Sequence, residues 1–248
     1  MNIKINMEVY KKVSAGIICL NYHNGEYRVL VVKKKTSYAF EYFIKTIHKK
    51  KKNSELIKCF KNMTYDEKFA LSTFNVDYIL YRLFSDFDSV KKYKTNIINN
   101  FTKYYTSYYS YNLIYGLLNT TSSIPLEYDL PRGRVNDDEM LLECAIREFR
   151  EETTLQKKQY RLFPKFSAKN IITDNNITYE YTYFLALLDD RENKINRNNT
   201  NYVNFYNKKQ SDELNELRWL NLNELKFYNP NIYNLVIKGV KFINKRIK

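Results

Sequence analysis

Residues 133 to 155 decide the fold, and they read Gly133-Arg-Val-Asn-Asp-Asp-Glu-Met-Leu-Leu-Glu-Cys-Ala-Ile-Arg-Glu-Phe-Arg-Glu-Glu-Thr-Thr-Leu155. A glycine-opened loop here runs into a helical pattern. Asn136 and Glu139, three residues apart, predict a capping box at the start of the helix. Its buried stripe is predicted from apolar residues at helical spacing, namely Leu142, Ala145, Ile146 and Phe149. The stretch therefore predicts a loop followed by an amphipathic helix.

Three carboxylates gather beside that stripe. Because each helical residue turns by about 100°, Glu148, Glu151 and Glu152 share one arc, and Arg147 stands four residues before Glu151. Clustered carboxylates repel one another unless cations offset their charge, and Mg²⁺ or Mn²⁺, which favour oxygen ligands, would do so. The alternative is a solvated acidic face. A metal site is favoured because a strand-like segment, residues 126–130, and a glycine loop lead into the acidic helix.

The same stretch resembles the Nudix box, G-x5-E-x7-R-E-U-x-E-E-x-G-U, in which U is an aliphatic or bulky apolar residue. The chain departs from the box at Thr154, where the family has glycine, and more mildly at Phe149. The family glycine closes the helix in a left-handed conformation, which a β-branched residue adopts poorly. We therefore expect the helix end to be rebuilt locally and the glutamates, which all precede Thr154, to be unaffected.

The resemblance implies an enzyme that hydrolyses a nucleoside diphosphate linked to another group, with water attacking a phosphorus. It marks Glu148 and Glu152 as metal ligands and Glu151 as a third ligand or the general base. Arg147 would orient a neighbouring glutamate, so the expected catalytic residues are Glu148, Glu151 and Arg147. Glu139 matches the first box glutamate, which supports the loop or contacts metal through water. Bound Mg²⁺ or Mn²⁺ would lower the pKa of water and neutralise charge on the phosphate oxygens.

Nudix enzymes commonly recruit one more carboxylate from outside the box, and Glu180 is the candidate metal ligand. It lies in the strand-like segment 177–187, where alternation places it beside Thr182 and on the face opposite to Tyr181. The alternative is an ordinary strand-edge carboxylate. Asp174, in the preceding loop-like segment, is the second candidate.

The chain of 248 residues exceeds a minimal Nudix domain but is short for two large domains, so one domain with an insertion is expected. Residues 13–21 and 27–33 read as the strands of an opening hairpin. Before the box, residues 36–123 intervene, far more than a connecting loop needs. The expected fold class is α+β, a Nudix α/β/α sandwich with a mixed sheet. Residues 1–35 and 124–248 would form this core, and 36–123 a mainly helical insertion.

The remaining elements follow from shorter patterns. Residues 64–67 form a predicted capping box inside the insertion. After the Nudix box, residues 162–188 read as strands, 214–219 as a last strand and 221–225 as a short helix. Residues 231–248 carry apolar side chains at helical spacing, so we expect a closing helix docked on the core.

The insertion is basic and rich in tyrosine. Its candidate RNA contacts are Lys49, Lys50, Lys51, Lys52, Lys91 and Lys92, and tyrosines crowd residues 104–111. Lysines interleaved with aromatic rings suit a single-stranded nucleic acid, since lysines meet phosphates and rings stack on bases. A codon bias toward Lys, Asn, Ile and Tyr is the alternative explanation. The net charge of +14 favours a polyanionic partner bound at many points.

A closer resemblance joins the insertion to the box. Residues 37–44, 56–64, 129–134 and 144–149 together are similar to the Nudix hydrolases of large cytoplasmic DNA viruses, the African swine fever virus type. That group is known both for mRNA decapping and for diphosphoinositol polyphosphate hydrolysis. We expect capped mRNA as substrate, cleaved to 7-methylguanosine diphosphate and RNA with a 5′ monophosphate. Inositol pyrophosphates are the alternative substrate. A catalytically silent RNA-binding Nudix protein is a third hypothesis, which the intact box residues disfavour.

Other features indicate a reducing compartment. Cys19, Cys59 and Cys144 are odd in number and lack metal-ligand spacing, so neither a disulfide framework nor a zinc site is expected. His23 and His48 are isolated. The first twelve residues do not resemble a signal peptide, and no apolar run approaches the roughly twenty residues of a membrane span. We expect a soluble protein of the cytoplasm, the host cytoplasm if the chain is viral.

Overall fold

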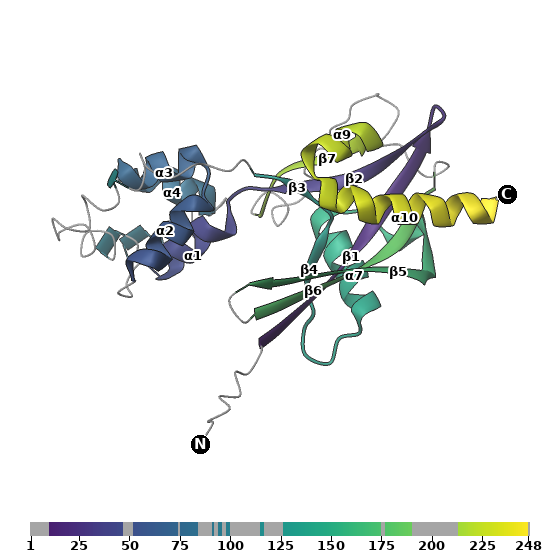
Figure 1. Cartoon of the computed structure of the whole chain (residues 1–248), viewed down its shortest axis with the longest axis horizontal. Coiled ribbons are helices and arrows are strands. Elements are labelled where there is room, and N and C mark those ends of the chain that lie inside the picture. Colours follow the sequence, from purple (N-terminus) through teal and green to yellow (C-terminus); the bar gives the residue numbers. More distant parts are fainter. Residues whose placement is uncertain are drawn as a thin grey trace, which may run out of the picture. The chain divides into compact units, whose positions relative to one another are not determined.

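A computed structural model describes residues 10–46, 52–73, 75–83, 91, 94–95, 98–99, 115–116, 126–174, 177–189 and 213–247. The chain divides into two compact units (Figure 1). Unit 1 comprises Met1–Val32, Tyr128–Gln210 and Glu216–Lys248, and unit 2 comprises Lys33–Glu127 with Ser211–Asn215. No helix among the described residues is both long enough and apolar enough to cross a membrane.

Unit 1 is built on a mixed sheet, as expected. Strand β1 (Tyr10–His23) turns at Asn24 and Gly25 into antiparallel β2 (Glu26–Lys34). Both turn residues have positive φ, 51° and 83°, which suits a two-residue hairpin turn whose twist matches that of the strands.

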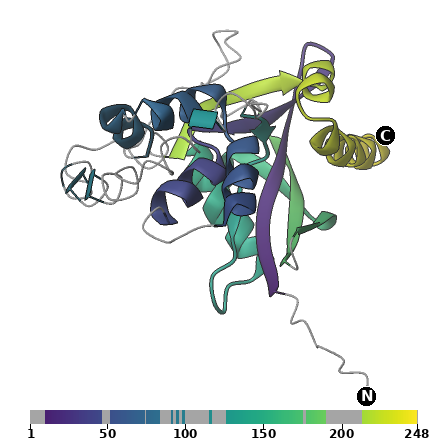
Figure 2. The ribbon, with the colours of Figure 1, turned by 60° about the vertical axis from the view of Figure 1, so that its left-hand side comes forward.

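The other strands extend the sheet on both sides of this hairpin. Strand β6 (Ile177–Leu188) runs parallel to β1 along most of its length, and β5 (Tyr160–Asp174) pairs antiparallel with β6 (Figure 2). The order is β3-β2-β1-β6-β5, with β7 (Leu214–Asn221) on β2 and β4 (Arg132–Arg134) antiparallel to β1. Strand β3 covers only Tyr128–Asp129, so the predicted strand over residues 126–130 was too long.

Helices lie on opposite faces of the sheet. Helix α7 (Leu141–Thr153) packs on β1, β4 and β6, on the face to which Ala15 points. Helix α10 (Pro230–Ile247) shares a core with Ile18 and Leu185, which point to the other face, and α9 (Leu222–Tyr228) precedes it. The expected α+β sandwich is therefore confirmed. A short 3-10 helix, η1 (Lys157–Gln159), leads into β5.

The start of α7 differs from the prediction. The helix begins at Leu141 with Met140 as N-cap, and the Asn136 amide donates to Glu139 Oε2 (3.0 Å) in a turn that precedes it. The predicted capping box was therefore a loop contact. The stripe is also shifted: Ala145 and Phe149 are buried, but Leu142 and Ile146 are only half-buried. The deepest positions of the helix also include Cys144, Glu152 and Thr153.

The end of α7 differs as well. Thr154 itself adopts the left-handed conformation, with φ 61° and ψ −4°, and its amide donates to the Arg150 carbonyl (2.9 Å). The expected local rebuilding of the helix end was wrong. A left-handed residue that is not glycine costs about 1–2 kcal/mol, and the surrounding contacts hold Thr154 in place. One of these contacts is the bond from its hydroxyl to the Thr153 carbonyl (2.7 Å).

The described part of unit 2 is helical, with α1 (Tyr38–Thr46), α2 (Asn53–Lys61), α3 (Tyr65–Ser72) and α4 (Val76–Leu83). It has a core of its own in which Phe43 packs edge-on against Phe60. The predicted capping box at residues 64–67 is confirmed. The fully buried Glu67 carboxylate accepts the Thr64 amide and both the amide and hydroxyl of Ser37, so one anion ties the starts of α1 and α3 together.

Candidate active site

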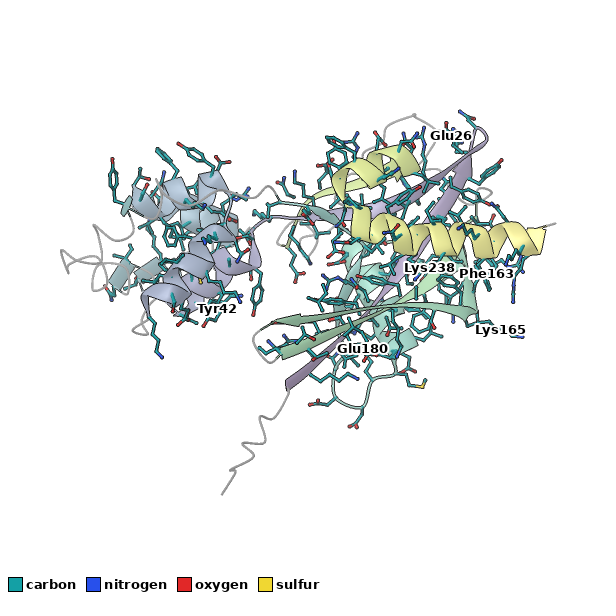
Figure 3. All side chains as sticks on the ribbon, in the orientation of Figure 1. Glu26, Tyr42, Phe163, Lys165, Glu180 and Lys238 are labelled. Atoms are coloured by element: carbon teal, nitrogen blue, oxygen red, sulfur yellow. The ribbon has the colours of Figure 1, made fainter. Side chains whose placement is uncertain are left out.

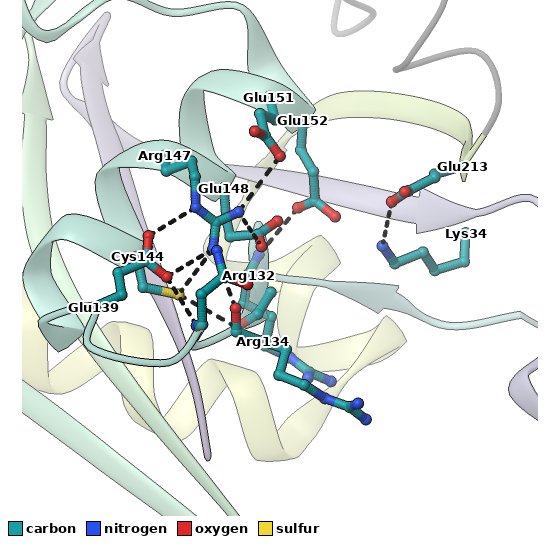
Figure 4. A network of polar contacts seen from close by, with 12 residues as sticks. Lys34, Arg132, Arg134, Glu139, Cys144, Arg147, Glu148, Glu151, Glu152 and Glu213 are labelled. Atoms are coloured by element: carbon teal, nitrogen blue, oxygen red, sulfur yellow. Dashed lines mark hydrogen bonds and ion pairs between the residues drawn. The ribbon is translucent and has the colours of Figure 1, made fainter. Parts of the chain in front are cut away.

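Arg147 is the hub of the acidic cluster on α7 (Figure 4). Its Nε and Nη2 donate to the two oxygens of Glu139, at 2.7 and 2.9 Å. Its Nη1 donates to Glu148 Oε1 (2.6 Å) and lies 3.6 Å from Glu151 Oε2. Arg147, Glu148 and Glu151 therefore lie together as predicted. The one guanidinium contacts the three carboxylates of Glu139, Glu148 and Glu151.

The same side chain fastens the loop to the helix. Arg147 Nη2 also donates to the carbonyl of Arg134 (3.1 Å), at the end of β4. The bond from Arg147, with the backbone amide of Asn136, lowers the pKa of Glu139 from 4.5 to about 2. The bonds to Glu139, and then to Glu148, raise the pKa of Arg147 well above its ordinary value. Glu139 and Arg147 are therefore both charged at neutral pH, and Arg147 ties the loop to the helix.

Gly133 makes room for the Glu148 carboxylate. A Cβ at this position would overlap that carboxylate, so any other residue would push Glu148 out of place. The Gly133 carbonyl also accepts a weak bond from the buried Cys144 thiol (3.7 Å). Burial raises the pKa of that thiol to about 11, so it stays neutral and fills space. The box glycine is thus required by its small size.

Glu152 is held by the backbone of β4. It is only 4% exposed, and its Oε2 accepts the backbone amide of Arg132 (3.0 Å). Strand β4 therefore supplies a donor to Glu152 and an acceptor to Arg147 within three residues. Figure 4 shows that Glu152 approaches this strand from the same helix as Glu148 and Glu151.

The donor set fits a hard divalent cation in its chemistry, since Glu148, Glu151 and Glu152 offer only oxygen. Among the residues that the structure describes, no three acidic, histidine or cysteine side chains converge into a ready metal cage. The reason is visible in the contacts of Arg147, whose Nη1 already occupies the space between Glu148 and Glu151.

Glu180 lies on the sheet face predicted for it but has other partners. It sits on β6 (Figure 3), in register with Val13, and the strand register places it on the side of Thr182 and Gly133. Its Oε2 pairs with Lys11 (2.7 Å) and its Oε1 with Lys169 (2.9 Å). The bonds from Lys11 and then Lys169 lower the pKa of Glu180 to about 2. Among the described residues, the contacts of Glu180 join it to these two lysines and to no box glutamate, and its role as a metal ligand stays a prediction.

The predicted RNA contacts fall mainly outside the described residues. This holds for residues 49–51 and for Lys92. Lys52 and Lys91 are described, and both are exposed. RNA binding by these lysines stays a prediction.

Three features of the site were not found from the sequence. They are the bidentate grip of Arg147 on Glu139, the amide of Arg132 on Glu152 and the two lysines on Glu180. The grip of Arg147 on Glu139 could have been anticipated from the sequence, because an arginine that faces several carboxylates has donors for more than one of them. The other two depend on strand pairing between distant segments, which no local pattern reports.

The glycine loop and the helix that presents Arg147 and three glutamates define a Nudix hydrolase. Residues 117–238 match the model of the NUDIX domain, and the chain belongs to this family. It is 28% identical over 220 residues to the mRNA-decapping protein g5R of African swine fever virus (isolate Warthog/Namibia/Wart80/1980), covering 87% of each chain.

Two further similarities are more distant. A putative mRNA-decapping protein of Acanthamoeba polyphaga mimivirus is 24% identical over 229 residues, covering 82% of this chain and 61% of that protein. The crystal structure of a C. elegans Ap4A hydrolase binary complex matches with a TM-score of 0.49 and 13% identity. That match covers 94% of this chain and 98% of the hydrolase.

Proposed function

We propose that the chain is an mRNA-decapping enzyme, which hydrolyses the 5′ cap to release 7-methylguanosine diphosphate and RNA with a 5′ monophosphate. The observation that carries the proposal is the cluster around Arg147, in which glutamates that can hold a cation stand beside the Gly133 loop. The names of the viral relatives support the choice of a capped RNA among the possible phosphoanhydrides.

In this proposal Glu148 and Glu152 hold the metal, and Glu151 is a third ligand or the general base. Glu151 pairs only distantly with Arg147, at 3.6 Å, whereas Glu148 is held at 2.6 Å. Both oxygens of Glu139 are bound by Arg147, so Glu139 acts here mainly by holding the arginine in place. Arg147 in turn holds the Arg134 carbonyl and so keeps the loop against the helix.

Nudix hydrolases generally use divalent metals, and we propose Mg²⁺ or Mn²⁺ here. When bound, such a metal would lower the pKa of water and neutralise charge on the phosphate oxygens. Glu148 and Glu151 would have to exchange contacts with Arg147 for contacts with the cation. The closeness of Arg147 to both carboxylates before the metal arrives limits their mutual repulsion.

The rest of the RNA would be held through charge. A capped RNA is a long polyanion, which suits a chain with a net charge of +14, and the lysines of the insertion are its proposed contacts. The described members, Lys52 and Lys91, are exposed and accessible to phosphates. Because mRNA is the substrate, we expect the enzyme to act in the cytoplasm, that of a host if the chain is viral like its relatives.

The site is tested with cap-labelled RNA and Mg²⁺ or Mn²⁺. We expect the wild-type chain to release methylated GDP and the Glu151→Gln, Glu152→Gln double variant to lose at least about a hundredfold of the rate, because general-base catalysis alone contributes 10²–10⁴. Glu143→Gln is the matched control, since Glu143 lies on the same helix, is exposed, and accepts the Met140 amide (3.3 Å) at the start of the helix. Undiminished release by the double variant would refute the assignment of the site.

A further inference from the structure

Arg132 joins the acidic site to the other face of the sheet. Its backbone amide donates to Glu152 (3.0 Å), but its side chain leaves on the face opposite to Gly133, because successive residues of a strand alternate. There its Nε and Nη2 donate to Asp129 Oδ2, at 3.1 and 2.6 Å. The guanidinium carbon lies 4.1 Å from the centroid of the Tyr181 ring.

The path of this side chain depends on Gly16. Strand β1 lies between β4 and β6, and Gly16 is in register with Arg132 on one side and Tyr183 on the other. A Cβ on Gly16 would overlap Arg132 Cβ and the Pro131 carbonyl. The missing side chain therefore lets the guanidinium cross β1 and reach Tyr181 on β6.

The cluster of Asp129, Arg132 and Tyr181 is partly exposed to solvent. The side chains of Arg132 and Asp129 remain 28% and 30% exposed, and Tyr181 is half-buried. Tyr183, the next residue on the same face of β6, is only 2% exposed and belongs to the core. The cluster thus stands at the border between the core and water, where a planar ligand can reach it.

The guanidinium of Arg132 resembles one nucleobase in its shape, charge and hydrogen-bond donors. It is a planar cation that stacks on a ring and gives two N–H groups to one carboxylate oxygen, Asp129 Oδ2. A 7-methylguanine base is also a planar cation, with two N–H groups along one edge. Building on the proposed function, we infer that Tyr181 and Asp129 form the subsite for the methylated guanine of the cap, and that Arg132 occupies this subsite until the base displaces it.

One substrate can reach both places because Arg132 contacts both. Its backbone amide donates to Glu152 on the α7 side, and its guanidinium lies over the ring of Tyr181 on the other face, beyond β1. Phosphates at Glu148 and Glu152 and a base at Tyr181 would belong to one molecule laid over β4 and β1. The displaced Arg132 guanidinium would stay close to the acidic cluster, because the Arg132 amide is bonded to Glu152. There it could pair with a phosphate of the substrate.

The test compares two capped RNAs on the full-length chain. Initial rates are measured with a 7-methylguanosine cap and with an unmethylated guanosine cap, and the ratio of kcat/KM values gives the preference for the methylated base. We expect wild type to prefer the methylated cap, and Tyr181→Ala to lower the ratio about tenfold or more, because a desolvated cation–π contact is lost. Poor folding lowers both rates together and leaves the ratio unchanged.

A second variant and a control complete the design. Asp129→Asn keeps the bond from the Leu130 amide to Oδ1 (2.7 Å) but removes the charge, and it should lower the ratio as well. Tyr179→Ala is the matched control, because Tyr179 lies on the same face of β6 under Lys12, 5.5 Å from its ring, and its loss should leave the ratio unchanged.

The possible outcomes distinguish a failure of the proposed base subsite from a failure of the proposed decapping function. A wild-type ratio near one, or an unchanged ratio in both Tyr181→Ala and Asp129→Asn, overturns the subsite while decapping stands. An equal loss in Tyr179→Ala also overturns it. A wild-type chain that releases no methylated GDP from either RNA refutes the proposed function itself.

Discussion

Replacing Thr154 by glycine should stabilise the protein without changing its activity. Thr154 holds a left-handed backbone at φ 61°, which costs an L-residue about 1–2 kcal/mol. Glycine removes that cost but loses about 0.5–1 kcal/mol through the greater freedom of the unfolded chain. The expected net gain is about 0.5–1 kcal/mol, which corresponds to a rise in Tm of roughly 1–4 °C for a chain of this size.

Differential scanning calorimetry and the decapping rate check this expectation together. Thr154→Ala keeps the positive φ without glycine's freedom, so it should not raise the Tm. Thr73→Gly is a second control, because Thr73 also ends a helix but has a right-handed φ of −88°, and it should destabilise. The rate should not change, because Thr154 contacts none of the groups bound by Arg147. A Tm lowered by Thr154→Gly, or an altered kcat, would refute the account of the helix end.

Three further predictions concern the cluster itself. Gly133→Ala should lower kcat about a hundredfold, because a Cβ there displaces the Glu148 carboxylate. Gly116→Ala should leave the rate unchanged, because a Cβ on Gly116 meets no atom of the described residues within 4 Å. Arg147→Lys should lower kcat about 10- to 100-fold with the fold retained by circular dichroism, because an ammonium cannot grip Glu139 in two places. The pKa of Glu139 is lowered from 4.5 to about 2 on folding, so its contribution to stability is complete above pH 4.5 and disappears as the pH falls toward 2. Denaturant titrations should therefore show wild type more stable than Glu139→Gln at pH 7 and converging with it at pH 2 to 3, and a constant difference would contradict the origin of the shift.

The acidic arc was predictable because helical periodicity fixes neighbours at three and four residues. Glu148 and Glu151 needed no tertiary information to be placed around Arg147. The sandwich and its mixed sheet were also predictable, since the hairpin, the box and the closing helix each carry a clear pattern. The sequence indicated that the residue at the end of α7 needs a left-handed backbone. Thr154 adopts that strained conformation itself, and the helix end is not rebuilt as a different loop.

The contacts that the sequence did not reveal come from signals that serve more than one structure. The spacing of Asn136 and Glu139 suits a helix start, yet here the same contact closes a turn that returns Glu139 to Arg147. Alternation placed Glu180 on the correct face, but it cannot show that Lys11 and Lys169 arrive from the two neighbouring strands. Local patterns define faces and neighbours along the chain, whereas contacts between strands depend on register.

Product analysis of capped RNA distinguishes decapping from hydrolysis of inositol pyrophosphates. The purified chain is incubated with cap-labelled RNA and, separately, with a diphosphoinositol polyphosphate, under the same conditions with Mg²⁺ or Mn²⁺. We expect methylated GDP together with RNA that a 5′-monophosphate-dependent exonuclease degrades, and we expect uncapped RNA to inhibit the reaction. RNA that stays capped while the inositol pyrophosphate is hydrolysed rapidly would contradict the proposed decapping function.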